Sequence, residues 1–271
     1  MGFLSEIVAA TRARVRSPAY LAGLSPTPPP RRASLREAVR RDAPRGALLV
    51  EYKRVSPGQP DPRLPARSVE DFVRATAPAP VTGYSCLATG PRFDGAPRDV
   101  ADLARATAVP VLFKDFVLEP VQLDAAVRAG ASAVLLIARL ETEGHLTVPL
   151  EALAAGAQTR GLEVLLEFHR RSELSVADRV PADMYGVNVR DLDSLALDRS
   201  AAEGTLGAAR EAGLVPLLGL SGVEDSRTAG RFWSAGADGL LVGTAVARSP
   251  DPVGFLRSLT REPAPGGEGP A

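Results

Sequence analysis

Ionisable and amide side chains stand at or near the ends of several short apolar runs in this sequence. They are Glu51 and Lys53, Lys114, Glu167, and Asn188 with Arg190. A lysine placed among carboxylates can donate and accept protons, which is what general acid–base catalysis requires. A charge beside a buried strand also costs free energy unless it is paired. The sequence therefore raises the question of whether one structure brings these residues together.

Eight apolar runs rich in valine and leucine recur from residue 46 onward, with amphipathic helical patterns between them. The runs cover 47–53, 81–87, 109–114, 131–137, 162–168, 183–189, 214–220 and 238–244. Such runs are typical of parallel strands that are covered on both faces. Helical patterns cover 68–77, 120–130 and 226–236, and Gly130, Gly161, Gly213 and Gly236 stand where helix C-terminal caps are expected. This alternation predicts an α/β fold, a (β/α)8 TIM barrel.

An open doubly wound sheet is the alternative architecture. That fold more often has a glycine-rich phosphate loop after its first strand. Here the first run leads into KRVSPGQPDPRLP (53–65), which contains no G-x-G-x-x-G motif. We therefore predict a barrel over 46–260, preceded by a helical extension over 1–45 and followed by a disordered tail over 261–271. The extension is expected either to plug the barrel floor or to join its upper rim.

The strand ends of a barrel meet at one mouth, where barrel active sites are built. The seventh and eighth runs end in a hydroxyl residue beside a glycine, namely Ser221 with Gly222 and Gly243 with Thr244. Loops at these two places commonly hold a phosphate with backbone amides and a helix N-terminus. Either pair alone is common in βα turns, but their joint position predicts a phosphate site.

Each candidate residue also has a structural interpretation. Lys114 could be an ion-paired structural residue, and Glu51 and Lys53, which point to the same face, could simply neutralise one another. His169 is more often a hydrogen-bonded support than a catalytic group at such a position. The presence of two lysines, two glutamates and an Asn-x-Arg pair at one mouth favours catalysis over these separate interpretations.

Composition narrows the class of protein. Lys+Arg and Asp+Glu balance at 32 each, so no overall field attracts nucleic acid or an anionic membrane. The single cysteine, Cys86, excludes an intramolecular disulfide and a cysteine-based zinc site. We expect no signal peptide, and the apolar runs fall short of the roughly 20 residues of a membrane span. We expect a cytoplasmic monomer or weak homo-oligomer that binds neither nucleic acid nor membrane.

Several segments together resemble the indole-3-glycerol phosphate synthase family. They are VEYKRVSP (50–57), YSCLATGPRFDG (84–95), FKDFVLEPVQLDAAVRAGASAVLLI (113–137), LLEFHRRSEL (165–174), YGVNVRDLDSL (185–195), LSGV (220–223) and LLVGTAV (240–246). They occur in the family's order and cover essentially the whole predicted barrel. The resemblance implies conversion of 1-(2-carboxyphenylamino)-1-deoxyribulose 5-phosphate to indole-3-glycerol phosphate, with loss of CO2 and water and without a metal or organic cofactor.

The same resemblance implies roles for individual residues. Lys114 matches the general acid that protonates the ketone oxygen during ring closure, and Glu167 matches the glutamate that assists later proton removal and dehydration. Glu51 and Lys53 match a pair that orders the site and contacts substrate. The implied substrate-binding residues are Ser56, Phe93, Phe116, Leu135, Asn188, Arg190, Leu192, Leu195 and Leu220, and the implied phosphate ligands are Lys53, Ser221, Gly222, Gly243 and Thr244.

Two departures from the family pattern stand out. Leu220 occupies the place of a glutamate in the usual Ser-Glu-Ser-Gly segment, and Ser56–Pro60 replaces a Ser-Pro-Ser-Lys-Gly loop, which removes a lysine. These changes keep two alternatives open beside the synthase. One is a diverged paralogue that acts on another phosphorylated aminoaryl sugar or performs part of the reaction. The other is a pseudoenzyme that binds a phosphorylated ligand without turnover.

Overall fold

The chain forms a closed barrel of eight parallel strands that follow one another in sequence order. The computed structural model describes residues 2–30, 32–65 and 67–261. The strands are β1 (Ala47–Tyr52), β2 (Gly83–Leu87), β3 (Val111–Lys114), β4 (Ala133–Ile137), β5 (Glu163–Phe168), β6 (Met184–Asn188), β7 (Leu217–Leu220) and β8 (Gly239–Val242). Each lies within one of the eight predicted runs, so the predicted (β/α)8 barrel is confirmed.

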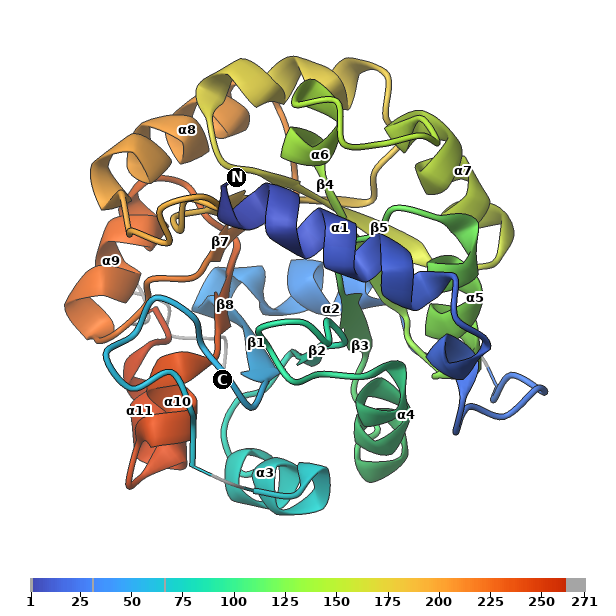
Figure 1. Ribbon diagram of the computed structural model, residues 1–271. Coiled ribbons are helices and arrows are strands. Elements are labelled where there is room, and N and C mark those ends of the chain that lie inside the picture. The colour runs from blue at the N-terminus through green and yellow to red at the C-terminus, as the bar shows by residue number, and fades with distance from the viewer. Residues whose placement is uncertain (1, 31, 66, 262–271) are drawn as a thin grey trace.

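Helices surround the barrel, as Figure 1 shows. They are α3 (Val69–Thr76), α4 (Pro97–Ala106), α5 (Pro120–Arg128), α6 (Ala138–Thr142), α7 (Leu150–Thr159), η3 (Arg171–Asp178), α8 (Arg199–Glu211), α9 (Ser226–Ser234), α10 (Thr244–Arg248) and α11 (Pro252–Ser258). The three helical patterns became α3, α5 and α9, and all four predicted cap glycines have positive φ. Of the tail predicted over 261–271, Arg261 is described, and residues 262–271 lie outside the described residues.

The N-terminal extension reaches both ends of the barrel. Its first helix, α1 (Phe3–Val15), crosses the mouth, and a short turn, η1 (Pro18–Leu21), follows it (Figure 1). The Arg14 guanidinium donates to the carbonyl oxygens of Ala88 at 2.9 Å and Gly95 at 3.1 Å, just after β2. At the other end of α1, the Leu4 amide donates to Asp193 Oδ1 at 3.4 Å, beyond β6. The helix is therefore fixed to loops on opposite sides of the mouth.

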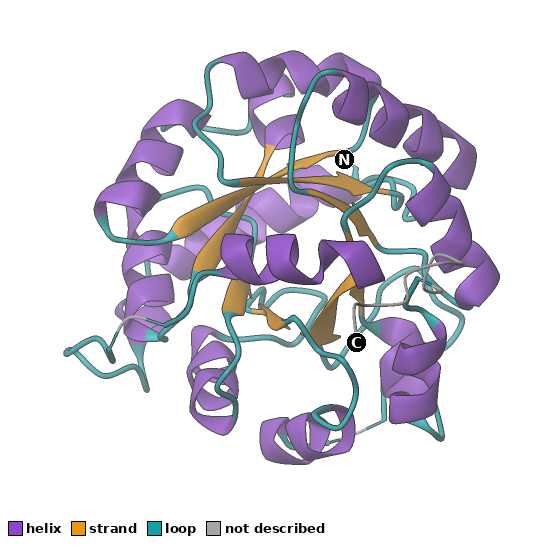
Figure 2. Cartoon of the chain, turned by 180° about the vertical axis from the view of Figure 1, so that it is seen from behind, coloured by secondary structure: helices purple, strands orange, loops and turns teal. Residues whose placement is uncertain are grey.

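The second helix of the extension closes the barrel floor. Helix α2 (Leu35–Asp42), followed by η2 (Ala43–Arg45), crosses the end of the barrel opposite to α1. Figure 2 shows the molecule from this opposite side. Glu163, the first residue of β5, accepts the backbone amides of Leu35 at 2.8 Å and Arg36 at 3.0 Å. A carboxylate at a helix N-terminus satisfies amides that the helix cannot pair itself. Both predicted placements of the extension are therefore found, one for each helix.

Side chains that face the barrel axis stack in layers, each supplied by alternate strands. The register of the strands places Leu49, Leu112, Leu165 and Leu218 in one buried layer. Two residues further along the same four strands are Glu51, Lys114, Glu167 and Leu220, which we call the upper layer. Successive inward positions are two residues apart. The barrel therefore changes from an apolar core to a mostly charged layer within one step of each strand.

The fourth member of the upper layer, Leu220, packs over a glycine. Gly186 on β6 faces the axis between the two layers, and a Cβ added there would lie 2.7 Å from Leu220 Cδ1. Two carbon atoms at such a short distance would have to move apart, and that movement costs free energy in a packed interior. The space that Gly186 leaves empty is therefore filled by the leucine side chain of β7.

We expect Gly186→Ala to lower the free energy of unfolding by about 1–3 kcal/mol, because the new methyl group overpacks the interior. In a Leu220→Ala background, where a cavity is present, the same change should cost much less. Urea unfolding measures both. Gly204→Ala on the exposed side of α8 is the control, since nothing lies within 4 Å of its added Cβ, and it should be neutral or stabilising. An equal cost of Gly186→Ala in both backgrounds would contradict this packing.

Candidate active site

One carboxylate, Glu51, holds two ammonium groups at the mouth of the barrel. Its Oε2 lies 2.7 Å from Lys53 Nζ, and its Oε1 lies 3.6 Å from Lys114 Nζ. Glu51 is buried, while the lysine side chains retain 15% and 17% of their exposure, enough to meet a ligand. The sequence contains no other lysine. Every lysine of this chain therefore points to the same carboxylate.

The two lysines determine the charge of Glu51. Burial raises the pKa of Glu51, but the ammonium groups of Lys53 and Lys114 outweigh it and hold the pKa below its ordinary value. Burial lowers the pKa of Lys53, and the nearby cations Lys114 and Arg190 lower it further against the opposing effect of Glu51. The carboxylate stays ionised, and Lys53 gives up its proton more easily than an exposed lysine.

A glycine on the neighbouring strand end leaves room for this ion pair. A Cβ added to Gly243, directly after β8, would lie 2.5 Å from Glu51 Oε2 and 3.2 Å from Lys53 Cε. Any side chain there would displace the carboxylate from the lysines. The glycine predicted as part of a phosphate site thus has a second, structural reason to be glycine.

Glu167 from β5 is a carboxylate of a different kind. It is buried, and none of the described cations lies within ion-pair distance of it. Burial raises the pKa of Glu167 above its ordinary value, although the charge of Lys114 works against this. The upper layer therefore contains one carboxylate that is held ionised and one that takes up a proton more readily than an exposed glutamate.

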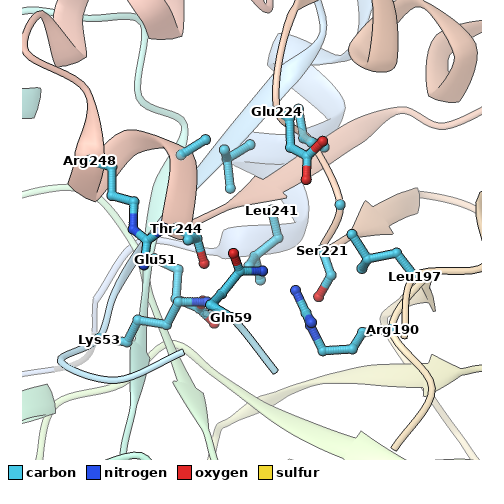
Figure 3. A pocket seen from close by; sticks show the side chains of 15 residues that line it. Glu51, Lys53, Gln59, Arg190, Leu197, Ser221, Glu224, Leu241, Thr244 and Arg248 are labelled. Carbon is cyan, nitrogen blue, oxygen red and sulfur yellow. The ribbon is translucent and has the colours of Figure 1, made fainter. Parts of the chain in front are cut away.

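Two adjoining cavities open at this mouth. The first, between the ends of β1, β7 and β8, is surrounded by the side chains of Lys53, Arg190, Ser221 and Thr244 (Figure 3). Ser221 and Gly222 both have positive φ, near 70°. A tight turn at a strand end can direct successive backbone amides toward one concave face, a geometry that suits anions. Burial lowers the pKa of Arg190, but a guanidinium remains charged in proteins.

The second cavity is more apolar and lies beneath α1. Lys114 and Glu167 line it together, as do Glu51, Lys53 and Arg190, which also line the first cavity. Its apolar wall consists of Phe3, Leu87, Phe93, Phe116, Leu135, Ile137, Leu192 and Leu195. The ring centroids of Phe93 and Phe116 lie 6.3 Å apart, and Phe3 of α1 meets Phe93 edge-on. The paired cavities thus offer an apolar end, an anion-suited end and charged groups between them.

The structure brings nearly all predicted site residues to this one place. The exception is Leu220, which is fully buried below and lines neither cavity. Sequence reasoning missed Phe3, Gln59 and Arg248, which do line the cavities. Phe3 precedes the barrel by more than forty residues, and the sequence left open which part of the extension would join the rim and which residues it would bring there. Arg248 had a usable signal, because it closes the short helix that follows the eighth strand.

Partly buried lysines and buried carboxylates at the mouth of a barrel, beside a rim that contains glycines, define a class of (β/α)8-barrel enzymes. Comparison with known proteins narrows this class. The model of the family described as indole-3-glycerol phosphate synthase matches residues 4–259. The chain therefore belongs to the indole-3-glycerol phosphate synthase family, whose members are lyases.

Individual relatives agree with this assignment. The chain is 34% identical to indole-3-glycerol phosphate synthase of Thermococcus kodakarensis, over 81% of this chain and 94% of that protein. It is 37% identical to the Methanopyrus kandleri enzyme, over 83% and 86%, and 33% identical to indole-3-glycerol phosphate synthase 2 of Streptomyces coelicolor, over 95% and 97%. A solved thiamine phosphate pyrophosphorylase from Pyrococcus furiosus shares the fold alone, with a TM-score of 0.55, 17% identity, and coverage of 81% of this chain and 95% of that one.

Within residues 2–30, 32–65 and 67–261, none of the helices is both long and apolar enough to cross a membrane.

We expect Glu51→Gln to lower the free energy of unfolding at pH 7 by about 3 kcal/mol, because it leaves two partly buried ammonium groups without their carboxylate. Glu37→Gln provides the matched control. Glu37 pairs with Arg40 at 3.3 Å on the exposed face of α2, where loss of the pair should cost less than about 1 kcal/mol. Urea unfolding of the three proteins measures both changes.

The cost of Glu51→Gln should also depend on pH. Since the folded-state pKa of Glu51 is lowered, its contribution is present above the ordinary glutamate value of about 4.3 and is lost as pH falls through the folded-state value. The difference between the wild type and Glu51→Gln should therefore shrink in acid. A difference that stays constant from pH 7 to pH 3, or grows in acid, would contradict the ion-pair account.

Proposed function

We propose that the protein converts 1-(2-carboxyphenylamino)-1-deoxyribulose 5-phosphate to indole-3-glycerol phosphate, releasing CO2 and water. One observation carries the proposal: Lys114 and Glu167 line the same apolar cavity, which continues across Glu51, Lys53 and Arg190 into the anion-suited cavity. The substrate has an aromatic acid at one end and a phosphate at the other. Its two ends match the two cavities, and membership of the family supports the same assignment.

The phosphate end of the substrate fits the first cavity. The amides at Ser221 and Gly222, the start of α10 after Gly243, and the hydroxyl of Thr244 supply donors at the rim. Ser56 Oγ lies 2.9 Å from Thr244 Oγ1 and thereby ties the loop after β1 to this rim. Lys53 adds positive charge. We assign the phosphate of the substrate to these groups.

The reacting end fits the second cavity. The anthranilate ring packs against Phe93, Phe116, Leu135, Leu192 and Leu195. In this proposal the ring carbon that carries the carboxylate attacks the ketone carbon, and the ammonium of Lys114 protonates the developing alkoxide. The C–C bond to the carboxylate then breaks, and its electrons return to the ring as CO2 leaves.

Dehydration completes the indole. The hydroxyl left by ring closure departs as water, and a base removes a proton to form the final double bond. Glu167 suits this step, because burial raises its pKa and makes it a stronger proton acceptor than an exposed glutamate. Asn188 and Arg190 hold the substrate between the two ends.

Leu220 makes a partial reaction the specific alternative. It removes a carboxylate from the upper layer and leaves only Glu51 and Glu167 there. A paralogue that stops before dehydration, or that takes another phosphorylated aminoaryl sugar, would fit this change. The cytoplasmic location and the monomeric or weakly oligomeric state stay predictions from the sequence, as do the boundaries of the extension, the barrel and the tail.

Turnover of the carboxyphenylamino substrate, followed by indole fluorescence and product mass, tests the main proposal. We expect the wild type to form indole-3-glycerol phosphate and Lys114→Met to lower kcat by about 10²–10⁴-fold, because the general acid is lost. Arg16→Met, at an exposed pair with Glu119, is the control and should turn over normally. A wild type that forms no product, or a fully active Lys114→Met, would rule the proposal out. A decarboxylated but still hydrated product would support the partial reaction instead.

Leu220→Glu tests whether the missing carboxylate limits the reaction. We expect it to raise kcat/KM by about tenfold, which corresponds to the free energy that one hydrogen bond to a charged group contributes. Leu220→Gln has nearly the same shape without the charge and should bring no gain. Lower activity with Leu220→Glu, in a variant that folds normally, would show that the mouth has been adapted to other chemistry.

A further inference from the structure

A buried histidine lies next to Glu167 but lines neither cavity. His169 follows β5 directly, and its side chain and that of Glu167 retain 2% and 1% of their exposure. Its Nε2 lies 3.3 Å from Glu167 Oε1, and its Nδ1 lies 3.9 Å from Glu173 Oε2. We call these three side chains the Glu167–His169–Glu173 cluster. His169 lines neither cavity, so it is not placed to touch a ligand.

The cluster contains unusual polar atoms. Among the described residues, three buried atoms of the cluster have no hydrogen-bond partner: His169 Nδ1, His169 Nε2 and Glu167 Oε2. A buried polar atom without a partner costs free energy, so such atoms are rare and call for a reason. Nε2 and Oε1 are close enough that a small rotation of either side chain would form the bond. The geometry is that of a pair ready to form a hydrogen bond when Glu167 changes its charge or orientation.

Glu173 holds the backbone at His169 in place. Its Oε2 accepts the backbone amide of His169 at 2.7 Å and that of Arg170 at 3.4 Å. Rotation of the imidazole is limited by this buried setting, and Nε2 is the nitrogen nearer to Glu167. The charged groups that bear on the cluster are Lys114 from β3, Glu51 from β1, Arg139 from α6, and Arg170 and Asp191 from the loops after β5 and β6.

We propose that His169 is a positioning residue for Glu167, with its Nε2–H donating to the Glu167 carboxylate and so setting both the direction and the proton affinity of that group. The proposal rests on the proposed function only in one respect, namely that Glu167 acts as the base of the reaction. Burial, with Arg139 adding to it, lowers the pKa of His169 to about 3. The ring is therefore neutral during turnover, and it acts as a donor rather than as a proton source.

This role matters more here because Leu220 removes the other carboxylate from the upper layer. Glu51 is held ionised by two lysines, so Glu167 is the carboxylate of that layer that can exchange a proton. A donor to its ionised form lowers its pKa and opposes the effect of burial. Without the donor, Glu167 would need a higher pH to act as a base.

Variants at His169 separate positioning from packing. His169→Leu removes the donor, and His169→Gln keeps an amide N–H near the position of Nε2. We expect His169→Leu to move the acid limb of the kcat profile upward by about one pH unit or more, with KM changed less than about twofold. His169→Gln should restore the wild-type profile. His145→Gln, at the other histidine of the sequence, is the control. An unchanged acid limb in His169→Leu, or equal effects of Leu and Gln, would overturn the proposal.

NMR keeps the test independent of turnover. The carboxyl ¹³C signal of Glu167, assigned with Glu167→Gln, should titrate at higher pH in His169→Leu than in the wild type or His169→Gln. If the wild type lacks turnover, the proposed function fails while this titration still decides the role of His169. If His169→Leu does not fold, the ¹⁵N spectrum of wild-type His169 decides it. A proton on Nε2 supports the proposal, and a proton on Nδ1 overturns it.

Discussion

The mouth of this barrel depends on one carboxylate that satisfies two ammonium groups. If Glu51 were absent, the ammonium groups of Lys53 and Lys114 would place two like charges in a largely buried space. With it, both lysines can stay at the boundary between an apolar cavity and an anion-suited one. Much of the surrounding sequence accommodates this pair, from the missing side chain at Gly243 to the leucine layer below. The charged upper layer is tolerated because the leucine layer beneath it is fully buried and packed.

The upper layer also shows how the fold assigns different tasks to similar groups. Glu51 on β1 and Glu167 on β5 occupy equivalent positions four strands apart. They differ in proton affinity because Glu51 meets two cations and Glu167 lies beside a neutral ring. Leu220, at the equivalent position of β7, contributes packing over Gly186 in place of a third carboxylate. The barrel geometry fixes where a side chain points, and the neighbours of that side chain decide its chemistry.

The eight-strand barrel could be predicted from sequence, because buried parallel strands produce continuous apolar runs and helix ends produce capping glycines. The convergence of Lys114, Glu167 and Arg190 followed from the rule that strand ends share one mouth. A position of the extension at the upper rim was one of two expected placements, but the path of α1 across the mouth could not be predicted. Its contacts through Arg14 and Leu4 are to loops far along the chain. The placement of Leu220 below the cavities was equally hidden, because it depends on the register between β6 and β7. His169 could be noticed but not interpreted without the distance to Glu167.

The restriction of lysine to two positions has a chemical consequence for the whole molecule. The remaining long basic side chains are arginines. Guanidinium groups do not form Schiff bases with simple aldehydes or react with acyl phosphates at neutral pH as free amines do. Reactive metabolites such as acyl phosphates and aldehydes would find side-chain amines only at the mouth, beneath α1. Damage of that kind would be rare, but each event would fall on the group at the centre of the molecule, and a bound ligand would shield it.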